Sequence, residues 1–102
     1  MMEIGLFQLE NLLAIQNQFV FLDIRVKFEE WPTALKPVLR NAVHVDQSRN
    51  YLATHKISKE TPIILICENG EKSKTVAREL ELEGYQQTYI VVEGVLGLLS
   101  EL

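Results

Sequence analysis

Three short and uninterrupted apolar runs, each ending at a polar residue, constrain the fold of this chain more than any other feature. Residues 19–22 precede Asp23, residues 62–66 precede Cys67, and residues 89–92 precede Glu93. Apolar runs without polar alternation are typical of strands that are buried on both faces of a parallel sheet. Residues 42–45 are a fourth and weaker candidate for a strand.

Helical patterns lie between these runs. The spacing of apolar residues predicts an amphipathic helix over residues 6–15 and another over residues 73–83. Gly84 follows the second of these as a stop signal. Its expected inner face is formed by Val76, Ala77 and Leu80, with Leu82 as a further candidate.

The remaining segments are shorter. Residues 47–54 and 95–101 are candidates for short helices, and residues 27–41, with two prolines, are expected to be irregular after one helical turn. Strands that alternate with helices predict an α/β fold, with a central and mainly parallel sheet of four to five strands flanked by helices. The chain has no linker, repeat or low-complexity tract, so residues 1–102 are predicted to form one domain.

Composition narrows the classes of partner and site. The formal charge of −4 and the pI near 5.1 argue against nucleic acid or an anionic membrane as the main partner. The single cysteine excludes an internal disulfide and a metal site built on several thiolates. No apolar run approaches the ~20 residues of a membrane span, and residues 1–15 lack the basic residues of a signal peptide. We therefore expect a cytoplasmic protein.

The segment most informative about chemistry begins where the second apolar run ends. It consists of Cys67, Glu68, Asn69, Gly70, Glu71, Lys72 and Ser73. Backbone N–H groups of a loop that leads into a helix, together with the helix dipole, stabilise an anion. A cysteine at this point is favoured as its nucleophilic thiolate. A cysteine after four aliphatic residues can equally be a core residue, and position alone leaves both interpretations open.

The ordered set of motifs resembles the rhodanese-like family from about residue 9 onward. That family typically has Cys-x-x-Gly-x-Arg-Ser between a strand and a helix, and Lys72 replaces its arginine here. The matching positions are Leu22, Asp23, Arg25, Glu29, Glu30, Trp31, Cys67, Gly70, Lys72, Ser73, Ala77, Leu80, Gly84 and Tyr85. The family's Gly-His-Ile-Pro-Gly-Ala stretch survives only as residues 38–42, and its paired glycines before the last helix become Glu93-Gly94.

The resemblance implies a sulfurtransferase, in which Cys67 carries a persulfide and Glu68, Asn69, Gly70, Glu71, Lys72 and Ser73 bind the substrate. It implies a small sulfur donor, a thiol, protein or cyanide acceptor, and no cofactor or metal. The residue after the cysteine is often arginine in active members, and here it is Glu68. Together with Glu71 it places negative charge in the loop. That charge repels thiosulfate, which is a dianion, so thiosulfate is not the expected donor. The oligomeric state is not specified by the sequence.

Two alternatives stay open. The first is a binding or regulatory module that keeps the fold and the cysteine but has little turnover. The second is phosphatase or arsenate-reductase chemistry, which is disfavoured because those loops resemble a cysteine, five residues and an arginine. Here the sixth residue after Cys67 is Ser73, and the next arginine is Arg78.

Five residues and one acidic cluster outside the loop have mainly structural expectations. Asp23 and Arg25 are expected to form a structural ion pair, and Trp31 to pack under the proline-containing loop. His44 and His55 lie in no motif, so hydrogen-bonded or solvent-facing roles are favoured over a Cys–His nucleophile pair. The acidic cluster of Glu79, Glu81 and Glu83 is expected to be a solvated helix face.

Overall fold

A computed structural model describes residues 1–15 and 18–102 of the chain. Five strands form one sheet in the order β1-β5-β4-β2-β3, and every neighbouring pair is parallel. The strands are β1 (Met2–Ile4), β2 (Val20–Asp23), β3 (Val43–His44), β4 (Ile63–Ile66) and β5 (Thr88–Val91). The predicted α/β fold with a parallel sheet is confirmed.

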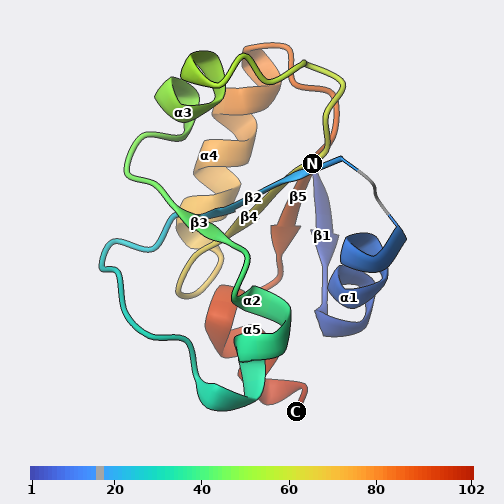
Figure 1. The fold of residues 1–102 in the computed structure, drawn as a ribbon, viewed down its shortest axis with the longest axis vertical. Coiled ribbons are helices and arrows are strands. Elements are labelled where there is room, and N and C mark those ends of the chain that lie inside the picture. The colour runs from blue at the N-terminus through green and yellow to red at the C-terminus, as the bar shows by residue number, and fades with distance from the viewer. Residues whose placement is uncertain (16–17) are drawn as a thin grey trace.

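Helices cover both faces of this sheet. They are α1 (Leu6–Ile15), a 3₁₀ turn (Thr33–Leu35), α2 (Lys36–Leu39), α3 (Ser48–Thr54), α4 (Glu71–Leu82) and α5 (Gly94–Ser100). Figure 1 shows α3 and α4 on one side of the sheet and α1, α2 and α5 on the other. No helix among the described residues is both long enough and apolar enough to cross a bilayer.

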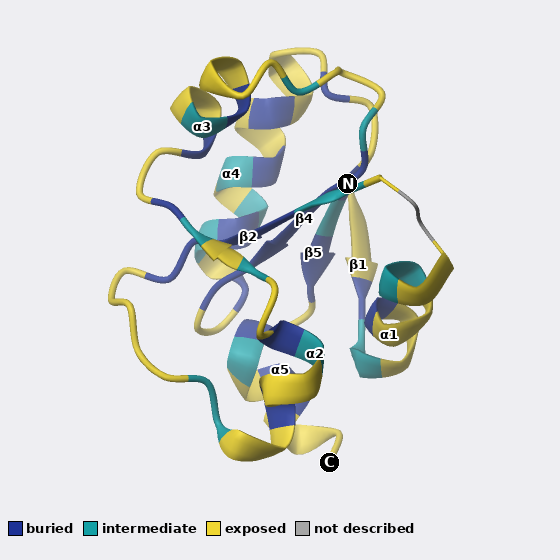
Figure 2. Cartoon of the chain, in the orientation of Figure 1, coloured by how far each residue is buried: buried dark blue, intermediate teal, exposed yellow. Residues whose placement is uncertain are grey.

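The central strand β4 explains why its sequence is apolar without interruption. Ile63 and Leu65 pack in the core cluster that α3 and α4 cover, and Ile64 and Ile66 pack in the cluster on the opposite face. Successive side chains of a strand point to opposite faces, so a sheet covered on both sides needs apolar residues at every position. Figure 2 shows β4 buried along its length, whereas edge strand β1 is largely exposed.

Three local expectations are corrected. Strand β1 lies at an edge where the sequence suggested no strand, because three residues with one buried side chain give too short a pattern. Leu82 is 90% exposed, since two residues beyond the buried Leu80 a helical side chain faces the other way. Helix α4 begins at Glu71, two residues earlier than expected.

The segment between β2 and β3 has the reverse of the expected order. Residues 24–32 are irregular, and the helical turns come afterwards. Pro32 lies at the N-cap of the 3₁₀ turn, and Pro37 lies in the first turn of α2. These are positions where proline is tolerated because the missing N–H has no intrahelical partner. The prolines therefore begin helical structure rather than exclude it.

Candidate active site

Cys67 follows the last residue of β4, at the edge of the sheet where the carboxyl ends of the strands meet. Its side chain is fully buried and packs in the cluster on the α3 and α4 face. The backbone N–H of Gly70 donates a hydrogen bond to its Sγ at 3.1 Å. A donor aimed at sulfur stabilises the thiolate more than the thiol. Because Sγ is covered, a reagent can reach it only when a neighbouring group moves.

The loop from Cys67 to α4 is tight because Gly70 adopts a left-handed conformation, with φ of +91°. Gly70 is also the N-cap of α4. The Asn69 Oδ1 accepts the N–H of Glu71 at 3.1 Å. Within the described chain, the N–H groups of Lys72 and Ser73 have no acceptor, and the buried Ser73 hydroxyl has no partner. The start of α4 therefore retains unused donors close to the cysteine.

Helix α5 holds the same loop from the other side. The N–H of Val95 donates to the Cys67 carbonyl at 3.0 Å, and the N–H of Leu96 donates to the Glu68 carbonyl at 3.2 Å. This contact requires glycine at position 94, where φ is +59° and a Cβ would lie 2.1 Å from the Cys67 oxygen. The first-turn donors of α5 thus find acceptors in the cysteine loop.

Glu68 reaches away from the loop toward the segment after β2. Its Oε2 accepts the N–H of Val26 at 3.0 Å. The contact joins two loops that are 42 residues apart in the sequence. The Glu68 carboxylate, whose negative charge was expected beside Cys67, therefore accepts a backbone hydrogen bond from the segment after β2.

The predicted ion pair between Asp23 and Arg25 is present and buried. The Arg25 Nε and one terminal nitrogen each donate to an Asp23 oxygen at 3.0 Å. Arg25 also donates to the Glu29 carbonyl at 2.8 Å, and its guanidinium lies 3.7 Å from the centre of the Trp31 ring. These contacts order residues 24–32, here called the β2–α2 segment, which carry Val26. Trp31 itself packs against the core cluster on the α1, α2 and α5 face.

A cleft of about 290 Å³ opens beside the cysteine loop. Its walls come from the β2–α2 segment, from the cysteine loop and from the first turn of α5. The lining residues are Arg25, Lys27, Glu29, Glu30, Pro32, Glu68, Val95 and Leu96. Two of them touch the cysteine loop directly, since Glu68 belongs to it and the Val95 N–H donates to the Cys67 carbonyl, so the cleft borders the backbone of that loop.

The other residues singled out in the sequence have partners elsewhere. His44 Nε2 is 3.0 Å from the Arg25 carbonyl, and His55 Nδ1 is 2.9 Å from the Tyr51 carbonyl, so neither ring pairs with Cys67. Arg78 is exposed in the middle of α4. Over residues 1–15 and 18–102, no group of three or more His, Cys, Asp or Glu side chains is arranged to hold a metal ion.

The acidic cluster on α4 is exposed as expected, but two of its members also form ion pairs. Glu81 pairs with the N-terminal ammonium at 2.8 Å, and Glu83 pairs with Arg49. Both pairs involve exposed carboxylates, for which such contacts contribute little to stability. The cluster therefore remains a surface feature.

Three features of the site were not identified from sequence. They are the bond between Glu68 and Val26, the clamp formed by α5, and the cleft. The Glu93-Gly94 pair was the available signal for the clamp, since both residues adopt positive φ. The other two features depend on which loops the fold brings together, and no local pattern carries that information.

Comparisons with known proteins agree with this architecture. The family model described as "Rhodanese-like domain" matches residues 8–101. The "Crystal Structure of Rhodanese-like Domain Protein from Staphylococcus aureus" superposes with a TM-score of 0.67 at 19% identity, covering 95% of this chain and 90% of that one. A NAD-dependent persulfide reductase from A. fulgidus superposes with a TM-score of 0.61 at 20% identity, covering 93% of this chain and 15% of that one.

Curated relatives match shorter parts of the chain. Thiosulfate sulfurtransferase GlpE of Coxiella burnetii is 29% identical over 56 residues, which are 55% of this chain and 52% of that protein. The chloroplastic calcium sensing receptor of Arabidopsis thaliana is 32% identical over 77 residues, which are 72% of this chain and 20% of that protein. The chain thus spans from a fifth to about half of the length of these relatives.

Proposed function

The chain belongs to the rhodanese-like domain family, and from this premise we propose that it is a sulfurtransferase that carries a persulfide on Cys67. The observation that carries the proposal is the hydrogen bond from the Gly70 N–H to the Cys67 Sγ. Such a donor favours the thiolate, and the thiolate is the form of cysteine that attacks sulfur. The unused donors at the start of α4 support the same conclusion.

The proposed reaction has two displacements at sulfur. The Cys67 thiolate attacks the outer sulfur of a donor persulfide, so that a bond from Sγ to that sulfur forms and the bond within the donor breaks. The donor leaves as a thiol, and the Cys67 persulfide remains. An acceptor thiolate then attacks the outer sulfur and releases the Cys67 thiolate. No net oxidation occurs, and the chain's single cysteine makes the acceptor a separate molecule.

Loop residues have distinct roles in this reaction. The N–H groups of Lys72 and Ser73, with the Ser73 hydroxyl, would receive the outer sulfur of the persulfide, while Asn69 and Gly70 fix the loop. Lys72 supplies positive charge at the start of α4, and Glu68 and Glu71 supply negative charge. A less charged donor is therefore favoured over thiosulfate, which is a dianion.

Intact mass spectrometry tests this function. The protein is incubated with thiosulfate and, separately, with a low-molecular-weight persulfide, before and after treatment with cyanide. We expect a gain of about 32 Da from the persulfide donor, absent from Cys67→Ser and reversed by cyanide, as for a reversible sulfur modification of cysteine. A folded and reduced protein that gains no sulfur from either donor would contradict the proposal.

A second candidate function is a binding module with little turnover. The complete burial of Cys67 among core residues favours it, because a buried free cysteine is commonly structural. The two candidates differ in the reactivity of the thiol. A binding module leaves Cys67 unmodified by both sulfur donors under native conditions, and the same thiol reacts only when the protein is unfolded.

A further inference from the structure

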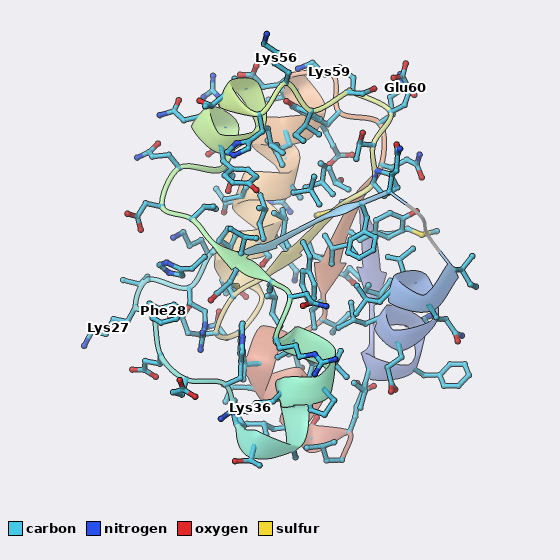
Figure 3. The ribbon with its side chains drawn as sticks, in the orientation of Figure 1. Lys27, Phe28, Lys36, Lys56, Lys59 and Glu60 are labelled. Carbon is cyan, nitrogen blue, oxygen red and sulfur yellow. The ribbon has the colours of Figure 1, made fainter. Side chains whose placement is uncertain are left out.

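The cleft beside the cysteine loop has a composition that points to a particular class of sulfur partner. Three of its lining residues are glutamates, namely Glu29, Glu30 and Glu68. One of its two cations, Arg25, is already neutralised by the buried carboxylate of Asp23. The other cation is Lys27, which projects from the β2–α2 segment away from the body of the molecule (Figure 3). The lining of the cleft therefore holds more carboxylates than cations free of a buried partner.

One glutamate has a surface partner. Glu30 pairs with Lys36 at 3.0 Å, but their side chains are 85% and 48% exposed. An exposed pair of this kind is weak and exchanges partners readily. Glu68 binds only a neutral backbone N–H in the contacts described. Both carboxylates can therefore be approached by a cationic group from outside the chain.

The cleft also has an apolar side. Pro32, Val95 and Leu96 line it, and Leu96 is 62% exposed. On the adjoining β2–α2 segment, Val26 and Phe28 are each 72% exposed, and Figure 2 shows that segment exposed over residues 26–30. Large aliphatic and aromatic side chains exposed around a cleft are typical of surfaces that contact another protein. A small charged thiol would leave most of this surface uncovered.

From this combination we propose that the partner exchanging sulfur with Cys67 is a cysteine in a basic segment of another protein, seated in the cleft with lysine or arginine beside the cysteine. This inference rests on the proposed function, since it names the substrate class of the same site. A basic side chain that pairs with Glu68 would draw its carboxylate from the Val26 N–H. Loss of that bond would release the cysteine loop from the segment after β2, which is the route by which docking would open access to Cys67.

The coupling leaves the chemistry of transfer unchanged. The partner's thiolate attacks the outer sulfur of the Cys67 persulfide, the bond between the two sulfurs breaks, and the Cys67 thiolate leaves. Complementary charge acts on the rate of encounter and on selection among partners. The basic flanks of the partner also favour its thiolate over its thiol.

Discharge of the loaded protein by matched peptides tests the proposal. Cys67 is loaded from a low-molecular-weight persulfide, and the decay of the persulfide mass is followed with the peptide Ala-Lys-Cys-Lys-Leu and with its counterparts in which glutamine or glutamate replaces both lysines. Cysteamine serves as a small cationic thiol. Rates are expressed per thiolate, after the pKa of each peptide thiol has been measured. We expect the basic peptide to react about tenfold faster than the acidic one at low salt, with the difference lost near ~0.5 M salt.

Charge reversal on the protein provides the matched control. The double variant Glu29→Lys and Glu30→Lys should reverse the order of the peptides. The double variant Glu10→Lys and Glu79→Lys changes the net charge equally on exposed positions of α1 and α4, outside the cleft. It should keep the original order. An order that is insensitive to the cleft variant, or equal rates for cysteamine and the basic peptide, would overturn the proposal.

Failure of this inference can be separated from failure of the proposed function. If Cys67 takes up no sulfur, the function fails, and binding then decides the partner class. The serine analogue of the basic peptide is titrated into the Cys67→Ser protein, and backbone amide shifts are recorded by NMR. Shifts at Val26, Glu68 and Leu96 that salt removes would support a basic partner. Their absence at millimolar peptide would overturn it.

Discussion

The carboxylate of Glu68 accepts a hydrogen bond from the Val26 N–H at 3.0 Å and so joins the cysteine loop to the segment after β2. On one side, this segment is ordered by the buried contacts of Arg25 with Asp23 and the Glu29 carbonyl. On the other side, the cysteine loop is held by Val95 and Leu96 of α5. The Glu68 contact is the exposed link between two better-anchored parts, and we expect access to Cys67 to be sensitive to its loss.

Removing this link should expose the thiol. We expect Glu68→Gln to raise the rate at which neutral iodoacetamide alkylates Cys67 by about fivefold, because a hydrogen bond to a charged group is worth about 1.5–3 kcal/mol and glutamine retains part of it. The rate is measured by intact mass under native conditions. Glu71→Gln is the control, since it removes the same charge nearby without a bond to the β2–α2 segment. Equal acceleration by both variants would assign the effect to charge alone.

Three glycines with positive φ should tolerate alanine in a defined order. At Gly84 a Cβ meets only the Lys59 Cδ, at 3.9 Å, whereas at Gly70 it would lie 3.0 Å from the Glu93 nitrogen. At Gly94 it would lie 2.1 Å from the Cys67 oxygen. Left-handed backbone costs a non-glycine residue about 1 kcal/mol or more, and steric overlap adds to this cost. Urea denaturation should rank Gly84→Ala as mildest and Gly94→Ala as most severe, and a larger loss at Gly84 than at Gly70 would contradict the geometry.

The buried ion pair should be far more sensitive to substitution than an exposed one. Arg25→Met leaves the Asp23 carboxylate buried without its partner, and we expect a loss of about 3–5 kcal/mol in the free energy of unfolding. Lys36→Met breaks the exposed pair with Glu30 and should change stability by no more than about 0.5 kcal/mol. Both are measured by urea denaturation at neutral pH. Comparable effects of the two variants would mean that the Asp23–Arg25 pair is not buried in solution.

Glu60 should titrate below the ordinary range for a glutamate. A hydrogen bond from the Ser58 hydroxyl, followed by a backbone hydrogen bond, lowers the pKa of the Glu60 carboxyl. Figure 3 shows Glu60 at the molecular surface. Because the folded pKa lies below the unfolded one, its contribution to stability is present above the unfolded pKa and is lost as pH falls through the folded pKa.

The Ser58→Ala variant tests this assignment. We expect the pKa of Glu60 to rise toward its ordinary value, as followed by NMR of the carboxyl carbon. Thr61→Ala is the comparison, since it removes a hydroxyl near Glu60 that is not among the causes of the lowered pKa. An unchanged Glu60 titration in Ser58→Ala would show that the Ser58 hydroxyl does not determine it.

The sequence by itself determined the buried strands of the sheet and the position of the cysteine at the end of one of them. Continuous apolar runs before Asp23, Cys67 and Glu93 specify strands covered on both faces, because polar alternation is absent only where both faces are buried. The spacing of Cys67, Gly70 and Ser73 identified the loop and placed the start of a helix within two residues of Glu71. These are local patterns, because the period of burial and the conformational freedom of glycine depend only on residues that are close in sequence.

Only the tertiary structure decided what surrounds that cysteine. The partner of Glu68 is an N–H 42 residues away, and the donors to the Cys67 and Glu68 carbonyls come from α5. Edge strand β1 forms because β5 offers it a free row of hydrogen-bonding groups. The three residues of β1 do not by themselves predict this pairing. Burial patterns fix which face of an element is covered, but they do not encode which backbone atom a polar side chain meets. That depends on the packing of α5 and of the β2–α2 segment against the sheet.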